Sequence, residues 1–164
     1  KLERDSATSE TNPSSDGALH VGKLKIHVND PLGIGSHGTI VFAGEYEGRG
    51  VAVKRLSKHL FENALREIAL LIETDQHPHV VRYYAREVDM NFIYVALERC
   101  SCSLADLVTG SCKTQPLLNE QRQPRQWTLD LLKALVDGVA HLHEKNIVHC
   151  DIKPGNILLT DDFR

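Results

Sequence analysis

The first hundred residues contain several short stretches in which apolar and polar residues alternate. Residues 24–28 read Leu-Lys-Ile-His-Val, and this period of two is typical of a strand with one buried face. The period recurs at Val51-Ala52-Val53-Lys54, so the alanine and the lysine share one face of a strand and the valines share the other. Strands are also predicted after the turn at residues 77–79 and over residues 91–98. We therefore predict a sheet in this half of the chain.

Helical spacing replaces the alternation in three segments. Residues 60–73 predict a helix, with Glu67 at the edge of its apolar face, where a carboxylate should have a partner. Residues 104–108 predict a short helix, and residues 127–143 predict a long amphipathic one. The apolar positions that define the two longer helices are Leu60, Ala64, Ile68 and Leu71 in the first, and Trp127, Leu131, Leu135, Val139 and Leu142 in the second.

The N-terminal segment, residues 1–22, has a different composition. It is rich in Ser, Thr, Asp, Glu and Gly and has almost no bulky apolar side chain. Such a segment cannot bury enough surface to offset the entropy lost on ordering. We predict a disordered linker over residues 1–22 and a domain over residues 23–164.

Composition and charge exclude several classes of protein. At 164 residues the chain has room for about one domain. Its formal net charge of −3 gives no reason to expect nucleic acid or an anionic membrane as a partner. No apolar run approaches the ~18 residues of a membrane span, and residues 1–16 lack the apolar core of a signal peptide, so we expect a soluble chain. The four cysteines form no C-x-x-C pair, which favours reduced thiols over disulfides or zinc ligands.

Three glycines follow the first predicted strand as G-x-G-x-x-G over residues 33–38. Glycines at this spacing let the backbone amides of a hairpin approach a phosphate chain closely. An ordinary hairpin turn and a dinucleotide-binding fingerprint are the alternatives. The fingerprint needs a helix after the last glycine, whereas the β-branched and aromatic residues 39–42 favour a strand. No Walker-type phosphate loop is present in the sequence.

Lys54 follows Gly38 by sixteen positions (54 − 38), which suits two antiparallel strands joined by a turn at residues 47–50. In that arrangement the glycine loop and the lysine can cover the same ligand. Ala52, on the same strand face, leaves room for a flat base. The alternative is a lysine on a solvated strand face, which the tetrapeptide alone would favour.

A polar loop, residues 149–156, precedes the apolar run at residues 157–159. Asp151 can orient an attacking hydroxyl and accept its proton, Lys153 can neutralise charge on a moving phosphoryl group, and Asn156 can offer an amide oxygen to Mg²⁺. The alternative is a loop in which Asp and Pro-Gly only form turns. The upstream chain favours the chemical interpretation, because it supplies a glycine loop, a strand lysine and a helix glutamate in a consistent order.

In that order and spacing the chain resembles the eukaryotic protein kinases over residues 24–159. Within that family it is similar to the plant branch of the endoplasmic-reticulum unfolded-protein-response sensors, the membrane-bound kinase/endoribonucleases of the inositol-requiring-enzyme type. The resemblance implies an α+β, protein-kinase-like fold, with an antiparallel small-lobe sheet and one helix over about residues 23–98 and the first helices of a large lobe over residues 99–164. The stretches that carry the second resemblance are Tyr46-Glu47-Gly48-Arg49, Val51-Ala52-Val53-Lys54-Arg55-Leu56, Asp75-Gln76-His77 and Leu97-Glu98-Arg99-Cys100-Ser101-Cys102-Ser103-Leu104.

The resemblance implies a role for each matching residue. Asp151 is the catalytic base, Lys153 the phosphate contact and Asn156 a Mg²⁺ ligand. Lys54 contacts the α- and β-phosphates and pairs with Glu67. Leu97 would stand at the back of the adenine pocket, and backbone groups of Glu98 and Cys100 would bind the adenine edge. The implied nucleotide-binding residues are Leu32, Gly33, Ile34, Gly35, Ser36, His37, Gly38, Thr39, Ile40, Ala52, Lys54, Glu67, Leu97, Glu98 and Cys100.

The resemblance also implies cofactors, partners and a location. The cofactors are ATP and Mg²⁺, and the substrate is a serine or threonine hydroxyl of another protein or of the protein itself, in autophosphorylation. A homodimer of the full-length parent is compatible with the family, whereas nucleic acid bound by this segment is not expected. The chain would be cytoplasmic, and its parent would reach the endoplasmic reticulum membrane through a segment outside this chain, with this domain on the cytosolic side.

Two departures from the family pattern limit these expectations. Cys150 replaces the arginine that in many kinases grips the phosphorylated activation loop, so control by loop phosphorylation is not implied. The chain ends at Arg164 before an Asp-Phe-Gly magnesium ligand, since the sequence at residues 162–164 lies too close behind Asn156 and lacks the glycine. We therefore expect a truncated domain with little activity by itself. The alternatives are a nucleotide-binding regulatory module and an inactive fragment.

Overall fold

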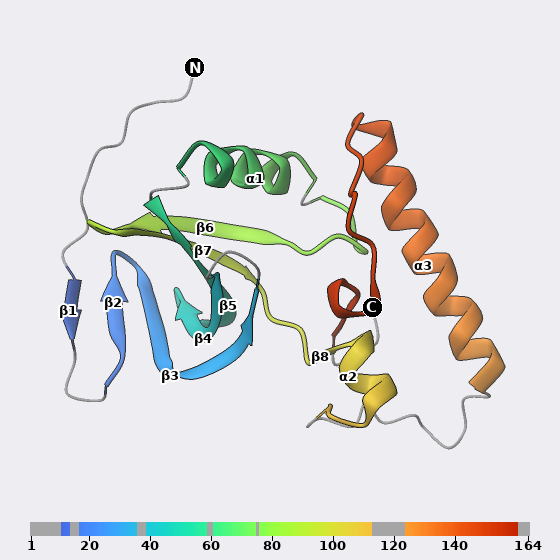
Figure 1. Cartoon of the computed structure of the whole chain (residues 1–164), viewed down its shortest axis with the longest axis horizontal. Coiled ribbons are helices and arrows are strands. Elements are labelled where there is room, and N and C mark those ends of the chain that lie inside the picture. Colours follow the sequence, from blue (N-terminus) through green and yellow to red (C-terminus); the bar gives the residue numbers. More distant parts are fainter. Residues whose placement is uncertain are drawn as a thin grey trace. The chain divides into compact units, whose positions relative to one another are not determined.

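The computed structural model describes residues 11–13, 17–35, 39–58, 61–74, 76–112 and 124–160, with the backbone alone at 11–13, 61–67 and 124. The chain forms two compact units. The first contains Lys1–Ala69 and Tyr83–Arg99, and the second contains Leu70–Arg82 and Cys100–Arg164. Figure 1 shows the elements of both. Those of the first unit are β1 (Thr11–Pro13), β2 (Leu19–Val21), β3 (Leu24–Ile34), β4 (Ile40–Tyr46), β5 (Arg49–Ser57), β6 (Tyr83–Val88), β7 (Phe92–Glu98) and most of α1 (Phe61–Thr74).

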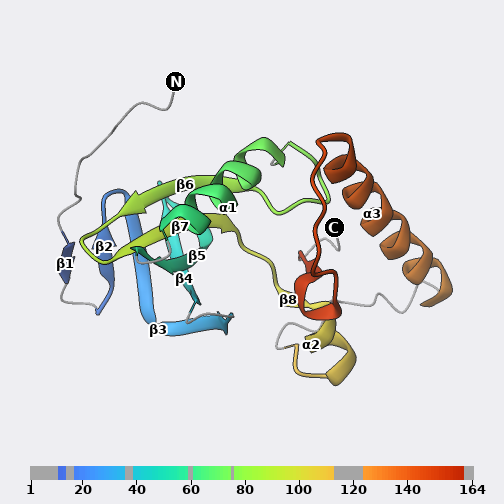
Figure 2. The same ribbon diagram turned by 45° about the horizontal axis from the view of Figure 1, so that its top comes forward.

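The seven strands form one sheet in the order β1-β2-β3-β4-β5-β7-β6, and all neighbouring strands are antiparallel. The β4–β5 connection is a two-residue turn, because Tyr46 pairs with Arg49 and only Glu47 and Gly48 lie between them. Both turn residues have positive φ, 49° and 79°, which is the geometry whose twist matches the flanking strands. The sheet curls along its length (Figures 1 and 2). The fold is therefore the α+β arrangement predicted, with an antiparallel sheet in the first half of the chain.

The hydrophobic core of the first unit is built on one face of this sheet. It draws side chains from five strands, and each buried aliphatic residue stabilises the fold by roughly 1.5–3 kcal/mol. Strand β5 contributes its two valines and leaves Ala52 and Lys54 partly exposed, as the period of two predicts. The buried members are Val21, Leu24, Ile26, Phe42, Val51, Val53, Tyr94 and Ala96.

The sheet begins closer to the N-terminus than the predicted first strand. Strand β2 lies within the segment predicted as a linker, and its Val21 is fully buried in the core. Ala18, just before it, is also buried. Residues 17–22 hold too few apolar side chains to show a period of two, and β2 is ordered because it pairs with β1 on one side and with the longer β3 on the other. Residues 1–10 and 14–16 lie outside the described part, so the linker stays a prediction there.

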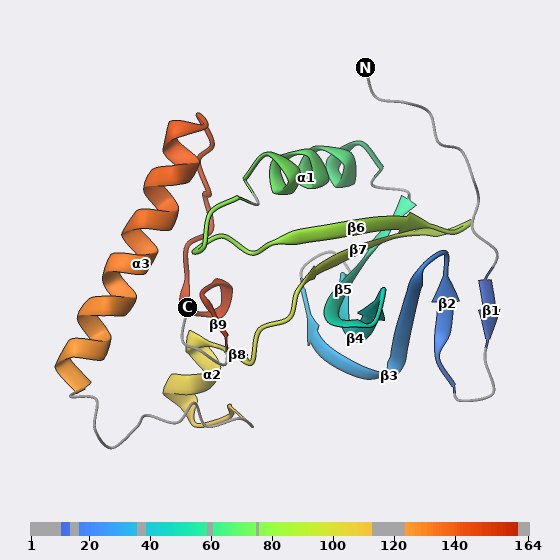
Figure 3. The same cartoon turned by 180° about the vertical axis from the view of Figure 1, so that it is seen from behind.

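The second unit holds a short two-stranded sheet and helices, and Figure 3 shows it from the far side. Helix α2 begins with a capping box, in which Ser103 accepts a bond from the backbone of Asp106 and the Asp106 carboxylate accepts one from the backbone of Ser103. The helix ends at Gly110, whose φ of 73° suits glycine. The elements are β8 (Cys102–Ser103), α2 (Leu104–Thr109), α3 (Pro124–Glu144), the 3-10 turn η3 (Pro154–Asn156) and β9 (Leu158–Leu159).

Helix α3 is three residues longer at its start and one longer at its end than predicted. Its predicted apolar stripe is half-buried. A second stripe, Leu129, Leu132 and Val136, is more than half exposed. Within the described residues, neither α3 nor any other helix is both long enough and apolar enough to cross a bilayer.

Gly44 in β4 provides a test of how tightly the core is packed. A Cβ at this buried position would lie 2.7 Å from both the Lys25 carbonyl oxygen and Val53 Cγ2. We expect Gly44→Ala to lower the free energy of unfolding by about 1–3 kcal/mol, because neither neighbour can move freely. Gly50→Ala is the matched control on the adjacent strand, since nothing lies within 4 Å of its Cβ. Urea unfolding measures both, and equal stabilities for the two variants would contradict the packing.

Candidate active site

The loop at residues 145–157 joins α3 to β9 and carries the polar residues singled out by the sequence. It begins where Asn146, with a left-handed φ of 59°, ends the helix. The Ile147 amide then donates to the Leu142 carbonyl at 2.9 Å, which satisfies an orphan carbonyl of the last helical turn. The loop therefore leaves α3 in a fixed direction.

The far end of the loop is anchored by β8 and β9. Cys102 pairs with Leu159 and Ser103 with Leu158. The Leu104 amide also donates to the Ile157 carbonyl at 2.8 Å, and Leu159 is 1% exposed. Since the capping box of α2 holds Ser103 in place, the loop is fixed at both ends by hydrogen bonds and at one end by burial.

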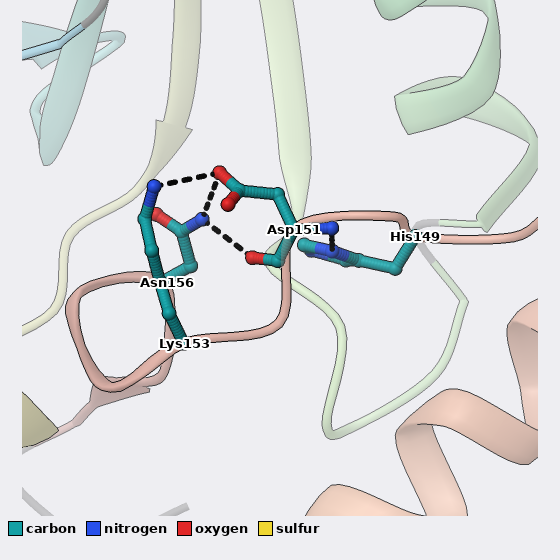
Figure 4. A network of polar contacts seen from close by, with 4 residues as sticks. All are labelled: His149, Asp151, Lys153 and Asn156. Atoms are coloured by element: carbon teal, nitrogen blue, oxygen red, sulfur yellow. Dashed lines mark hydrogen bonds and ion pairs between the residues drawn. The ribbon is translucent and has the colours of Figure 1, made fainter.

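Three side chains of the loop meet in one polar network, shown in Figure 4. Lys153 Nζ lies 2.9 Å from Asp151 Oδ2. Asn156 Nδ2 donates to the same Oδ2 and to the Asp151 backbone carbonyl, both at 2.8 Å. The short turn η3 makes this possible, because it brings Asn156 back over Asp151. The structure thus brings together the three residues that the sequence predicted to act as a set.

The network leaves specific atoms open. Asp151 Oδ1 and Asn156 Oδ1 accept no hydrogen bond from the described residues. The pKa of Asp151 is held below its ordinary value, first by the hydrogen bond from Lys153 and then by the one from Asn156. The carboxylate therefore stays ionised at neutral pH, with one oxygen held and the other able to accept a bond from a ligand hydroxyl.

The residues just before Asp151 set the direction of its backbone. Cys150 has a φ of 60°, a left-handed conformation that is uncommon for a residue with a side chain. Its Sγ lies 3.4 Å from the Val148 carbonyl, and the Asp151 amide donates to His149 Nδ1 at 3.2 Å. The imidazole of His149 thus serves as a backbone acceptor, a role that the sequence did not reveal because any acceptor of similar length could fill it.

In the first unit, one face of the sheet carries four of the other predicted residues, Gly33, Ala52, Lys54 and Leu97. Cross-strand partners share a face, and one row runs from Gly33 through Val41 and Lys54 to Val95. The next row runs through Ala43, Ala52 and Leu97. Because adjacent strands are about 4.8 Å apart, Gly33 and Lys54 are separated by about two strand spacings. Gly33, Lys54, Ala52 and Leu97 are therefore on one face of the sheet in this unit.

Other predicted residues have different positions. Ile40 pairs with Arg55 and packs against the core, on the opposite face from Lys54. The residue of β4 that pairs with Lys54 is Val41, which was not among the predicted residues although strict alternation along the strand would have found it. Leu32 and Ile34 in β3 are exposed, Ile34 by 80%.

The remaining positions are only partly described. Gly35 donates its amide to the Thr39 carbonyl at 2.8 Å. Glu98 ends β7, and Cys100 follows it at the start of the second unit. None of the four cysteines, all of which the structure describes, forms a disulfide. Ser36, His37, Gly38 and the side chain of Glu67 lie outside the described residues.

A magnesium ion would find one suitable protein ligand in the described loop. The open amide oxygen of Asn156 is a hard oxygen donor of the kind Mg²⁺ prefers, and Mg²⁺ commonly takes one or two protein oxygens together with waters and phosphates. The part of the chain that the structure describes holds no group of three His, Cys, Asp or Glu side chains placed to bind a metal. The residues fit a metal that arrives with phosphates and do not form a closed metal cage.

Comparison with known proteins shows which protein family the chain resembles. Residues 26–163 match the family model of the protein kinase domain. A sensor for unfolded proteins in the ER from Schizosaccharomyces pombe is 40% identical over 146 residues, 89% of this chain and 13% of that protein. The serine/threonine-protein kinase/endoribonuclease IRE2 of Homo sapiens is 43% identical over 149 residues, 91% of this chain and 15% of that protein. The corresponding IRE1a of Arabidopsis thaliana is 38% identical over 174 residues, 87% and 21%. The chain thus spans less than a quarter of the length of these relatives.

The Asp151 network predicts a measurable titration. We expect the Asp151 carboxyl to titrate below its ordinary pKa of 3.8 and expect Lys153→Met to raise that pKa, because the largest cause of the lowering is removed. Since the pKa is lowered, the contacts are present above the ordinary value and are lost as the pH falls through the lowered one. Carboxyl carbon NMR shifts against pH measure this. Lys145→Met, just after α3, should leave the titration unchanged, and a wild-type value at or above 3.8 would contradict the network.

Proposed function

The chain belongs to the protein kinase domain family, and from that premise we propose that its residues transfer the γ-phosphoryl group of ATP to a serine or threonine hydroxyl. The observation that carries this proposal is the state of Asp151: Lys153 and Asn156 hold one carboxylate oxygen, while the other accepts no bond from the residues that the structure describes. A base for phosphoryl transfer needs both a fixed position and an open oxygen.

Asp151 and Lys153 would divide the work in the second unit. The open Oδ1 of Asp151 accepts the proton of the attacking hydroxyl and so orients that hydroxyl. Lys153, already 2.9 Å from the carboxylate, lies close enough to turn its ammonium toward a phosphoryl group as negative charge moves. Because the pKa of Asp151 is lowered, orientation of the nucleophile is its main contribution, and proton acceptance comes late.

The first unit would bind the nucleotide through the face that carries Lys54. The partly exposed side chains of Val41, Ala52 and Leu97 offer a flat apolar surface for adenine. Lys54 lies one ladder row away from Ala52 and Leu97, so its ammonium can reach the α- and β-phosphates. In this proposal Lys54 also pairs with Glu67 of α1, and backbone groups of Glu98 and Cys100 hold the adenine edge.

Magnesium would join the second unit through the open oxygen of Asn156. When bound, the ion neutralises charge on the transferring phosphates. Asn156 has two tasks in this arrangement, since its Nδ2 group holds Asp151 while its Oδ1 atom is left for the metal.

The relatives suggest the wider setting of this domain. Their printed names describe kinase/endoribonucleases and a sensor for unfolded proteins in the ER. We infer that the protein carrying this domain is such a stress sensor, phosphorylates another protein or itself, and can act as a homodimer. Its kinase domain would face the cytosol, and attachment to the membrane would use a segment outside the printed sequence. No residue of this chain is assigned to ribonuclease chemistry.

Substitution of the two charged residues tests the assignment of roles. On the naturally occurring protein, Asp151→Asn should lower kcat by about 10²–10⁴-fold, and Lys54→Met should lower kcat/KM for ATP by about 10²-fold or more. Lys58→Met, four positions further along the same chain segment, is the matched control and should leave both unchanged. Transfer of labelled phosphate to a serine peptide measures these values. Unchanged phosphorylation in both active-site variants would sink the proposal.

Metal dependence separates a kinase from a nucleotide-binding scaffold. We expect ATP to bind at least about tenfold more tightly with Mg²⁺ than without it, because Asn156 supplies a ligand to the bound metal. Asn156→Ala should remove most of that difference, whereas Asn156→Asp keeps an oxygen ligand and should retain it. Isothermal titration with ATP and ADP measures the affinities, with Gln126→Ala on α3 as control. Equal affinity with and without metal would favour the scaffold.

A further inference from the structure

Three histidines of the second unit meet away from the loop at residues 149–156. His77 and His79 belong to the segment after α1, and His141 lies in the last turns of α3. The rings of His77 and His141 are stacked, with centroids 4.8 Å apart and planes at 19°. The rings of His77 and His79 meet edge to face at 5.6 Å. This three-histidine cluster is the contact between residues 77–80 and α3.

The backbone of the segment lies directly on the helix at this place. A Cβ on Gly138 of α3 would stand 2.8 Å from the His79 carbonyl oxygen, so only glycine permits the approach. Within the segment, the His79 amide donates to His77 Nδ1 at 3.2 Å and the Val80 amide donates to the His77 carbonyl at 3.1 Å. His77 therefore organises the segment and also stacks on the helix.

The cluster is arranged for neutral rings. His77 Nδ1 is already an acceptor, so its single proton belongs on Nε2 when the ring is neutral. His141 Nε2 is buried and has no hydrogen-bond partner among the described residues. A second proton on one stacked ring would place a charge in a partly buried site, and a second proton on both rings would place like charges about 5 Å apart, each at an electrostatic cost. The carboxylates that face His77 are Asp137 and Glu144 of α3, and they oppose that cost only in part.

We propose that His77, His79 and His141 form a proton-sensitive latch, which holds residues 77–80 on α3 while His77 is neutral and releases them when His77 is protonated. A metal site is the rival interpretation of three histidines. The stacked rings of His77 and His141 do not converge on a common point, and the described residues contain no metal-binding group of three. The latch is therefore a contact between protein groups.

The electrostatics of His77 agree with this geometry. Burial first, and then the proximity of His141 and His79, lower its pKa below the ordinary 6.5, while Asp137 and Glu144 act in the opposite direction. The lowered pKa means that the folded segment binds fewer protons than the released one. The stability that the latch contributes is therefore complete above the ordinary pKa and is lost as the pH falls from there through the lowered value.

Hydrogen exchange of the amides at His79 and Val80 tests the latch in the 164-residue chain, because both amides bond to His77. Between about pH 8 and pH 5, we expect their protection factors, corrected for intrinsic exchange, to fall severalfold. The amide of Leu104, which bonds to the Ile157 carbonyl in the same unit, should keep its protection. Ring-nitrogen NMR should show neutral His77 protonated on Nε2 and titrating below 6.5.

Variants separate the latch from general acid sensitivity. His141→Leu keeps an apolar contact but removes the imidazole that stacks on His77, and we expect it to weaken the fall in protection at low pH. His77→Gln removes the titrating ring and should abolish that fall, with lower protection at every pH. His143→Gln, two residues from His141 on an exposed position of α3, is the matched control and should behave like the wild type. An unchanged fall in protection in both cluster variants, or a His77 that titrates at or above 6.5, would overturn the proposal.

Discussion

Strand β5 packs one face into the hydrophobic core and carries Lys54 on the other, and the arrangement of much of the first unit depends on this. Val51 and Val53 are fully buried in the core, while Ala52 and Lys54 must stay on the other face. The pairing of β5 with β4 and β7 then decides which other residues share that face, and it selects Val41 and Leu97. A shift of one residue in register would send Lys54 into the apolar core, where an unpaired charge is costly. Core packing therefore also fixes the position of the lysine.

In the second unit, a polar loop has to keep one conformation although it is not buried. Asp151 and Lys153 are both more than half exposed, and an exposed ion pair contributes little stability. The order of the loop comes from its two ends: the left-handed Asn146 that ends α3, and the buried Leu159 of β9 paired with β8. Because the two ends keep the loop ordered, the side chains between them do not have to contribute to stability and can serve the chemistry.

The ordered ends of the loop also explain where two strained or unpartnered groups occur. Cys150, with its left-handed backbone, lies between the fixed end of α3 and Asp151. The unpartnered nitrogen of His141 lies on the helix that leads into the loop. Such features persist only where surrounding structure over-determines the local geometry, and in both cases the surrounding structure is α3 and the segments packed on it.

The sequence by itself determined most of the elements and predicted which residues carry the chemistry. Periods of two and 3.6 located β5, β7, α1 and α3 to within a few residues, because burial of one face imposes those periods directly. The meeting of Asp151, Lys153 and Asn156 was also predictable, since the ends of the set are only five positions apart and a tight turn must bring them together. That β2 is an ordered strand was not predictable, because its order comes from pairing with β3 and from a core that distant strands complete. Two further features were not predictable: Val41, and not Ile40, shares a face with Lys54, and His77 stacks on His141. Each depends on register or on contacts between segments far apart in the chain, and local periodicity carries no information about such contacts.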